Sequence, residues 1–493
     1  MKKYFYILVF AVLMGGLTSC NDWLDVSPKD RIPADKMFES ESGFKDILTG
    51  AYLKLGTANL YAGDMKYGYL DELAGLYCDY PGYNTNSVYN QAIVFDYTNQ
   101  FLSKKDNLYL EMYNVVANLN NLLQNIETHR DVLKTPHYYE CIKGEALGLR
   151  AFIYFDLLRL FGPIYSEHPT DAAIPYKTIY DKEPTPVLPA NQVVEKILED
   201  LKAAEALLKD NDPCDFHTAI DQRTDFLSNR EFRMNLYAVK AMMARVYCYS
   251  GQNDLAVQYA QEVINANKYF TLYKSQTASN YNSIRYGEQI FGLSVNQLNN
   301  TLISNSMDME NTSVQQRYGM TADMFTKVYE GITSDWRQNV VAFNWDESHQ
   351  YAFCLKYNQA PLADNSGADA IPLIRLPEMY YIIAECAANA ETSAEALNTV
   401  RLSRGIPYSD EIHTLGYDDK DVTSEENKQQ TRRINEIMKE YRKEYYAEGQ
   451  LFFFLKAHHY TTYYGCGVAN MTSKEYQMPL PDNEKIFGNN TTK

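Results

Sequence analysis

Aromatic side chains gathered in two segments are the residues best suited to chemistry in this chain. The 493 residues include 42 tyrosines, 21 phenylalanines and 3 tryptophans. A tyrosine ring has a flat apolar face and a polar hydroxyl, so it suits stacking on polar, ring-shaped ligands, although packing beneath the loops is the alternative. Both segments are aperiodic and rich in asparagine and glycine. The candidate site residues are Asp71, Tyr77, Tyr80, Tyr83 and Tyr89 in the first segment, and Tyr273, Tyr281, Tyr286 and Trp345 in the second.

No catalytic signature accompanies these rings. A glycan hydrolase needs an acid and a base or nucleophile about 5 to 9.5 Å apart, and the 63 acidic residues single out no such pair. His458 and His459 are adjacent, so on a helix they point about 100° apart, unlike a chelating pair. The segment 364–369 has the residue types of a calcium loop but lacks its downstream glutamate. We therefore predict that the protein is not an enzyme and has no cofactor and no metal site.

The charge balance excludes one class of partner. Lysine and arginine total 46 against 63 aspartates and glutamates, which gives a formal charge of -17. Such a surface repels a phosphate backbone, so nucleic acid is not expected to bind. With 45% hydrophobic and 22% charged residues, the composition is that of a packed globular protein.

The first twenty residues have the pattern of an export signal. Lys2 and Lys3 precede an apolar run over residues 4–16, which is too short to span a bilayer and resembles a signal-peptide core. The run ends in Leu17-Thr18-Ser19-Cys20, which resembles a bacterial lipobox. We predict that residues 1–19 are removed and that Cys20 is acylated. A soluble secreted protein with an incidental Cys20 is the alternative.

The remaining cysteines form no recognisable site. They are Cys78, Cys141, Cys214, Cys248, Cys354, Cys386 and Cys466, an odd number without a CxxC spacing. Zinc and redox motifs are therefore absent from the sequence. In an exported protein they could form disulfides, but Cys141, Cys248 and Cys386 fall within helical patterns, which favours their interpretation as small buried hydrophobes.

Helical periodicity fills much of the chain. One apolar face ends at Gly162-Pro163, and a second helix is predicted from about Pro189 to residue 208. Two further stripes, separated by Gly251, resemble a tetratricopeptide hairpin, and the pattern recurs over 379–400. Because such hairpins cannot bury their faces alone, we expect them to stack. The helical repeats are predicted over about 100–270 and 375–460, with a loop-rich region over about 271–370.

Five stretches resemble, in order, the SusD/RagB family of Bacteroidetes outer-membrane lipoproteins. The first is Leu24-Asp25-Val26-Ser27-Pro28, just after the lipobox. The others are Arg150-Ala151-Phe152 with the exit turn Leu160-Phe161-Gly162-Pro163; Arg375-Leu376-Pro377-Glu378-Met379-Tyr380 continuing to Arg404-Gly405; Glu440-Tyr441-Arg442-Lys443-Glu444 continuing to Glu448-Gly449; and Tyr476-Gln477-Met478-Pro479-Leu480-Pro481.

The resemblance implies a fold, a location and partners. The fold would be mainly α, a single SusD-like domain over 20–493 with four tetratricopeptide-like hairpins and an irregular region on one side. The protein would be a lipid-anchored, outward-facing outer-membrane protein that captures a glycan or oligosaccharide. It would deliver this ligand to a TonB-dependent, SusC-like transporter.

Departures from the family pattern leave the ligand open. The stacking tryptophans of starch-binding members have no obvious equivalents. Trp23 lies by the tether and Trp336 in a turn, and only Trp345 lies in a loop suited to ligand binding, so starch is not implied. A protein-interaction scaffold or a peptide-binding lipoprotein is the alternative, and a glycoside hydrolase is less favoured. The conserved-looking charges at Arg375, Glu440 and Glu444 are expected to cap and cross-link helices through intrahelical ion pairs rather than contact ligand.

Overall fold

Helices dominate the described part of the chain, which confirms the predicted mainly α fold. The computed structural model describes residues 36–78, 80, 92–217, 225–274, 277, 280–298, 318–338, 342–358 and 366–488. The predicted signal peptide and Cys20 lie outside these residues. In the described residues no helix is both long and apolar enough to cross a membrane.

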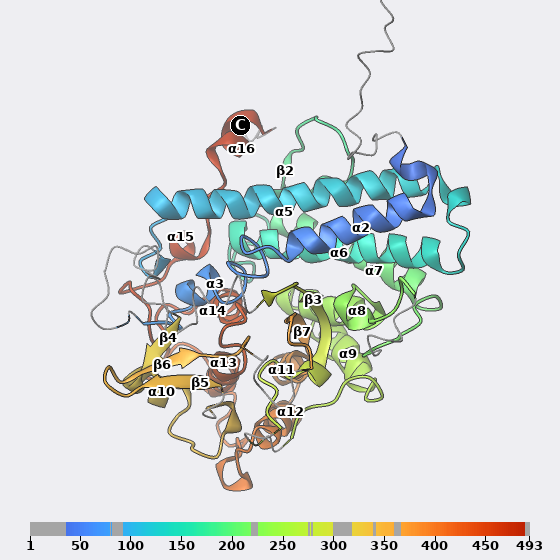
Figure 1. Ribbon diagram of the computed structural model, residues 1–493. Helices are drawn as coiled ribbons and strands as arrows, with labels where there is room; N and C mark the ends of the chain where they lie inside the picture. The colour runs from blue at the N-terminus through green and yellow to red at the C-terminus, as the bar shows by residue number, and fades with distance from the viewer. Residues whose placement is uncertain are drawn as a thin grey trace, which may run out of the picture.

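Three long helices form one layer of the molecule (Figure 1). Helix α2 (Glu41–Leu55) packs on α5 (Asn99–Ile126), which packs on α6 (Tyr138–Phe161). Helix α6 is buried on nearly every side, as expected of a helix that is apolar around most of its circumference. It ends before Gly162, as the sequence predicts. The short elements in this half are η2 (Met37–Glu39), α3 (Tyr69–Leu73) and η3 (Arg130–Val132).

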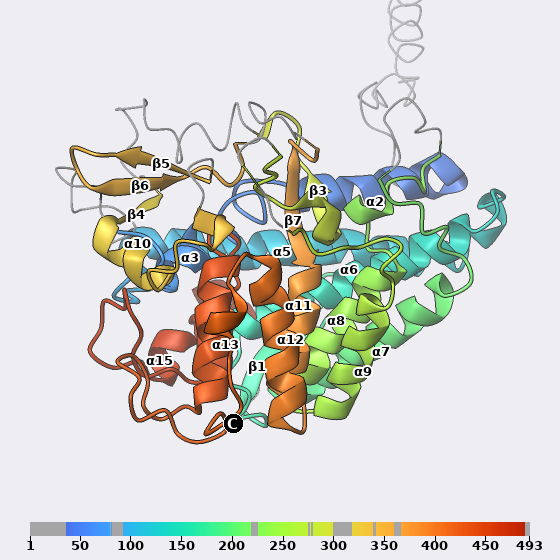
Figure 2. The same ribbon diagram turned by 90° about the horizontal axis from the view of Figure 1, so that it is seen from below.

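Helical hairpins pack against this layer. Helix α6 pairs with α7 (Ala190–Leu208), after a small antiparallel ribbon of β1 (Ala172–Pro175) and β2 (Val187–Pro189). The next pairs are α8 (Leu236–Tyr249) with α9 (Asn253–Ile264), α11 (Leu376–Cys386) with α12 (Ala390–Ser403), and α13 (Arg432–Glu444) with α14 (Leu451–Ala457). Figure 2 shows α8, α9, α11 and α12 side by side.

Local sequence explains where these hairpins begin and pack. The Asn235 side chain caps α8 by accepting a hydrogen bond from the backbone nitrogen of Ala238. Between α8 and α9, Gly251 has φ +74°, a left-handed conformation that glycine adopts without strain. The small side chains of Ala256 and Ala260 are buried on α9. The predicted hairpin over these residues is therefore present.

The region between α9 and α11 contains more regular structure than predicted. Strand β3 (Gln289–Ser294) pairs antiparallel with β7 (Ala370–Arg375), and β4 (Gly319–Thr321), β6 (Tyr351–Cys354) and β5 (Phe343–Asp346) form a three-stranded sheet in that order. Strands of three to six residues are too short to show a clear two-residue alternation, so the sequence pattern does not reveal them. Helix α10 (Ala322–Val328) lies beside the sheet. The remaining elements are η5 (Arg230–Phe232), η6 (Tyr286–Glu288), η8 (Trp336–Gln338), η9 (Tyr408–Asp410), α15 (Ser473–Tyr476) and α16 (Asp482–Phe487).

Candidate functional site

The three-stranded sheet carries Trp345 on one of its faces. In β5, Trp345 is paired with Ala352 of β6, and the next residue, Asp346, is paired with Tyr351. Successive side chains of a strand point to opposite faces, so Trp345 and Asp346 project on different sides. The half-buried Trp345 ring packs edge-on against Phe325 of α10, with ring centroids 4.9 Å apart. Helix α10 therefore fixes the orientation of this indole.

Tyr80 packs on the other face. Its ring lies 5.2 Å from that of Tyr351 and 5.5 Å from that of Phe353. Its hydroxyl donates a hydrogen bond to Asp346 and lies 2.9 Å from Nδ1 of His349. Hydrogen bonds from the hydroxyls of Ser348 and Tyr80 hold the pKa of Asp346 well below its usual value, so this carboxylate is ionised at neutral pH. A half-buried ring beside a carboxylate and an imidazole can recognise the hydroxyl groups and flat faces of a sugar.

A second aromatic group lies between α9 and β3. The hydroxyl of Tyr286 donates to Glu231 Oε1 at 2.7 Å, and the ring meets that of His217 edge-on at 4.8 Å. The Tyr273 ring packs closely against Gly287: a Cβ added to this glycine would lie 3.1 Å from the ring. Both tyrosines are half-buried. They therefore offer a second, partly accessible aromatic surface held by polar contacts.

Three predicted site residues are buried, which corrects their assignment as ligand contacts. Asp71 is fully buried and its Oδ1 accepts a hydrogen bond from the backbone of Gly449 at 2.9 Å. Tyr77 is 2% exposed and its hydroxyl donates to Asp71, while Tyr281 is 1% exposed and packs edge-on against Trp336. A ligand at the surface cannot reach these groups, so they support the loops from beneath. Tyr83 and Tyr89 lie outside the described residues.

The family-like charges form a buried network. Arg375 donates to Glu448 at 2.6 and 3.0 Å and to Glu444 at 2.7 Å, and Arg404 donates to Glu288 and Glu444 at 2.9 Å. Although burial would raise the pKa of Glu444, Arg404, Arg285 and Arg375 hold it well below its usual value. The structural role predicted for these charges is present. Glu440 forms the predicted intrahelical pair with Lys443 at 2.7 Å, whereas Arg375 and Glu444 pair with charges of other elements. The partners come from different elements, because packing brings η6, β7, α12 and α13 together.

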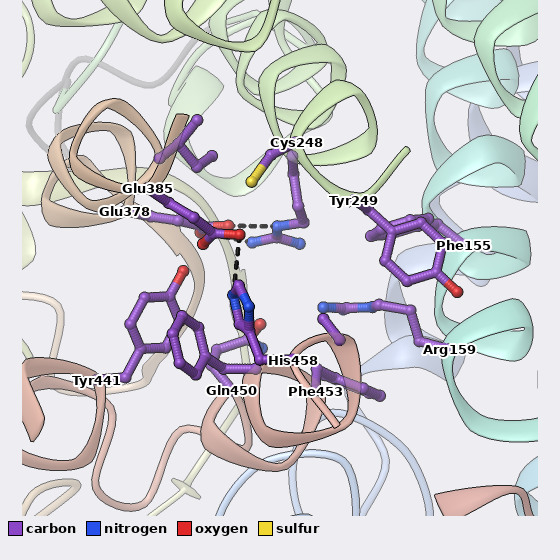
Figure 3. A pocket seen from close by; sticks show the side chains of 14 residues that line it. Phe155, Arg159, Cys248, Tyr249, Glu378, Glu385, Tyr441, Gln450, Phe453 and His458 are labelled. Atoms are coloured by element: carbon purple, nitrogen blue, oxygen red, sulfur yellow. Dashed lines mark hydrogen bonds and ion pairs between the residues drawn. The ribbon is translucent and has the colours of Figure 1, made fainter. Parts of the chain in front are cut away.

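A small polar cavity lies between α6, α8, α11 and α14 (Figure 3). Its volume of about 60 Å³ accommodates a few water molecules but not a sugar ring. Arg245 binds both carboxylate oxygens of Glu378, and His458 Nε2 lies 3.0 Å from Glu385 Oε1. A hydrogen bond with Cys386, together with burial, raises the pKa of the Cys248 thiol well above its ordinary value. The thiol is therefore protonated at neutral pH and unsuited to act as a nucleophile.

Two larger clefts contain none of the predicted site residues. One, of about 600 Å³, lies between α5, the β1–β2 connection and α16, and is lined by Tyr109, Tyr113 and Glu484 among others. The other, of about 710 Å³, lies beside α13 and includes Lys327 and Tyr464. Both volumes are in the range of small-ligand sites. The lining residues of each cleft come from distant segments, so sequence spacing gave no signal for them.

Across the described residues, no group of three or more histidine, cysteine, aspartate or glutamate side chains is placed to hold a metal ion.

Comparison with known proteins identifies similar sequences and folds. A family model described as "SusD family" matches residues 229–492, and one described as "Starch-binding associating with outer membrane" matches residues 22–248. SusD-like proteins P2 and P38 of Formosa agariphila are 24% and 23% identical, over 55% of this chain and 48% and 47% of theirs. The chain thus spans about half the length of these curated relatives.

Solved structures match over a larger share of the chain. A SusD-like carbohydrate binding protein from Bacteroides vulgatus superposes with a TM-score of 0.68 at 18% identity, covering 92% of this chain and 97% of that one. A SusD superfamily protein from Bacteroides fragilis gives a TM-score of 0.66 at 19% identity, covering 93% and 100%. At these identities the likeness extends to the fold alone.

Proposed function

The chain belongs to the SusD family, and from this premise we propose that it is a lipid-anchored outer-membrane protein that binds a glycan and passes it to a TonB-dependent transporter. The observation that carries the proposal is the arrangement around β5. Tyr80, Asp346 and His349 gather on one side of the sheet, and Trp345 lies on the other. Rigid rings next to ionised and amphoteric groups bind sugars with little loss of conformational entropy.

Binding without catalysis is part of the proposal. The polar cavity of Figure 3 is too small for a sugar, and its thiol is protonated. The buried carboxylates of the central network are each bound by arginines, so they are not free to transfer protons to a surface ligand. Neither feature supports hydrolysis. The solved structure from Bacteroides vulgatus that shares this fold is described as a SusD-like carbohydrate binding protein, which supports this class of function.

The proposal is tested by binding and by partnership. The full-length protein, purified in detergent, is applied to an array of plant and host glycans, and positive glycans are measured by calorimetry with assays for new reducing ends. Saturable binding of one glycan class without release of reducing ends is expected. Binding of peptides alone would favour the alternative of a peptide-binding lipoprotein, and new reducing ends from highly purified protein would contradict a purely binding role.

The transporter is tested separately. Affinity purification in mild detergent is expected to recover the protein together with a large outer-membrane β-barrel. Repeated recovery without such a partner would contradict the delivery step while leaving glycan binding intact. A scaffold would instead recover soluble protein partners and bind no glycan.

A further inference from the structure

A small buried cavity lies where α13, the three-stranded sheet and the segment before η6 meet. Its volume of about 20 Å³ has room for one species of about the size of a water molecule or a halide ion. All of its described lining residues are at least nine-tenths buried, and the aromatic ones are Tyr281, Tyr329, Phe343 and Tyr446. The cavity therefore belongs to the interior of the fold rather than to the surface that would meet a glycan.

The charged residues that line this cavity are all basic. They are Arg285, Arg337, Lys356 and Lys443, and none of the described lining residues is an aspartate or a glutamate. These basic side chains pair with carboxylates that do not line the cavity, as Lys356 does with Glu448. The cavity is thus bordered by positive charge alone.

The ion-pair network around the cavity also contains more basic than acidic groups. Glu440 and Glu444 are shared by six basic side chains, which are Arg285, Arg337, Arg375, Arg401, Arg404 and Lys443. Further ion pairs add the basic Lys356 and Lys439 and the acidic Asp335, Glu288, Glu330, Glu436 and Glu448. Among the described residues, eight basic groups are therefore linked to seven acidic ones, which leaves one net positive charge. Because a buried charge without a counter-charge is unfavourable, a monovalent anion would be stabilised here.

Two hydrogen-bond donors of the lining residues are left over. The Nε–H of Arg285 and the hydroxyl of Tyr446 are buried and form no hydrogen bond with the described part of the chain. Another nitrogen of Arg285, Nη1, lies 3.4 Å from the Ser283 carbonyl oxygen and 3.9 Å from Glu444 Oε1, so its own contacts are long. Buried donors in native proteins are nearly always paired. Both an N–H and an O–H group can donate to a halide ion.

We propose that this cavity binds one chloride ion, held by the Nε–H of Arg285 and the hydroxyl of Tyr446. A water molecule would accept the same two hydrogen bonds but would leave the net positive charge without a counter-charge. Phosphate and sulfate are too large for the volume. The ion would join the segment before η6 to the residues that follow α13, which are distant in sequence. This inference goes beyond glycan binding and does not depend on it.

Chloride-dependent stability tests the site in solution. The full-length protein is unfolded with urea at pH 7 in sodium gluconate that is replaced stepwise by sodium chloride at constant ionic strength. A site that exists only in the folded state lowers the unfolding equilibrium constant by about tenfold for each tenfold rise in chloride above the dissociation constant. Bromide should act like chloride. Equal stability throughout the chloride series would overturn the proposal.

A pair of neighbouring tyrosines provides a matched comparison. Tyr446→Phe removes one donor and keeps the ring, so the chloride dependence should move to concentrations at least about tenfold higher. Tyr445→Phe is the control, because Tyr445 is also 2% exposed and its hydroxyl has no partner in the described residues, but it does not line the cavity. This variant should respond to chloride like the parent. A shift of the same size in both variants would contradict the assigned site.

X-ray diffraction gives a second readout that needs no variant. In crystals of the full-length protein grown with sodium bromide, an anomalous bromide peak is expected within hydrogen-bonding distance of Arg285 Nε and the Tyr446 hydroxyl. Density at this position without an anomalous signal would identify a water molecule and overturn the proposal, even if a variant failed to fold. Since neither readout uses a glycan or a transporter, failure here is distinguishable from failure of the proposed function.

Discussion

Tyr80 and Trp345 lie on opposite faces of the same three-stranded sheet. Trp345 packs on Phe325 of α10, whereas Tyr80 donates a hydrogen bond to Asp346, the residue that follows Trp345 in β5. The two rings therefore flank the end of one strand, close to the turn that leads into β6. A ligand lying across this end of the sheet could contact both rings.

Replacement of either ring should weaken glycan binding without unfolding the protein. Tyr80→Ala and Trp345→Ala are each expected to lose about 1–3 kcal/mol of binding free energy, the range measured for aromatic stacking on nucleobases. Tyr80→Phe keeps the ring and loses the bond to Asp346, so it separates stacking from polar recognition. Calorimetry with the glycan found on the array gives the affinities, and thermal melting checks the fold. If all three folded variants bind like the parent, the site lies elsewhere, for example in one of the two larger clefts.

Asp71 should affect stability rather than binding. Burial raises its pKa to about 8, so the folded protein keeps this proton between about pH 4 and 8 while the unfolded chain loses it. The folded state then binds more protons, and the free energy of unfolding falls as pH rises through this window. Asp71→Asn should remove this part of the pH dependence in urea titrations from pH 4 to 8 and leave glycan affinity unchanged. A large loss of affinity in a folded Asp71→Asn protein would instead restore Asp71 as a ligand contact.

The buried arginine network should be costly to break. Arg375→Met removes the arginine that binds both Glu444 and Glu448 in a buried site, where loss of one ion partner typically costs about 3–5 kcal/mol. Arg130→Met is the matched control, because Arg130 is largely exposed and its 3.6 Å pair with Glu140 is expected to contribute less than about 1 kcal/mol. Chemical denaturation of both variants gives the comparison. Equal losses would mean that the central network contributes no more than a surface pair.

Lys456 should make the protein more stable at alkaline pH. Its Nζ donates to the carbonyls of Arg159 and Gly162 at 2.7 Å, and burial, with Arg159 nearby, lowers its pKa from 10.5 to about 7. Between these values the unfolded chain binds the proton and the folded protein does not. The free energy of unfolding therefore rises with pH between these values, by up to about 1.4 kcal/mol per pH unit. Below about pH 7 the lysine is protonated in both states, so this pH dependence is absent there.

Replacement of Lys456 isolates this effect. Lys456→Met should flatten the rise between pH 7 and 10, whatever its effect on overall stability, whereas Lys474→Met at an exposed position should leave the slope unchanged. Urea titrations at each pH supply the free energies. An unchanged slope in Lys456→Met would show that the lysine stays protonated in the folded state.

Cys20 should determine membrane attachment. Cys20→Ala removes the acyl acceptor of the lipobox, so the variant is expected to leave the outer-membrane fraction in cells that lack the transporter. Cys466→Ala is the control for loss of a cysteine elsewhere. Fractionation followed by immunoblotting measures the distribution. A Cys20→Ala protein that still sediments with the outer membrane would contradict the lipid anchor.

Local sequence determined the helical framework. The end of α6 at Gly162, the start of α7 after Pro189 and the α8–α9 hairpin follow from the spacing of apolar side chains and from glycine and proline, which act within a few residues. Five family-like stretches in order likewise predicted the SusD fold. The lipobox is also a local sequence signal, and the acylation of Cys20 that it indicates stays a prediction.

Only the tertiary structure decided which side chains meet and which are covered. Tyr80 reaches Asp346 across 266 positions, and Arg404 reaches Glu288 across 116, so neither pair has a spacing that sequence periodicity can detect. Tyr77 and Tyr80 lie three residues apart in similar sequence, yet one is buried and the other half-exposed. Burial depends on the segments that pack over a residue, and these come from distant parts of the chain whose arrangement is set by the packing of the whole core.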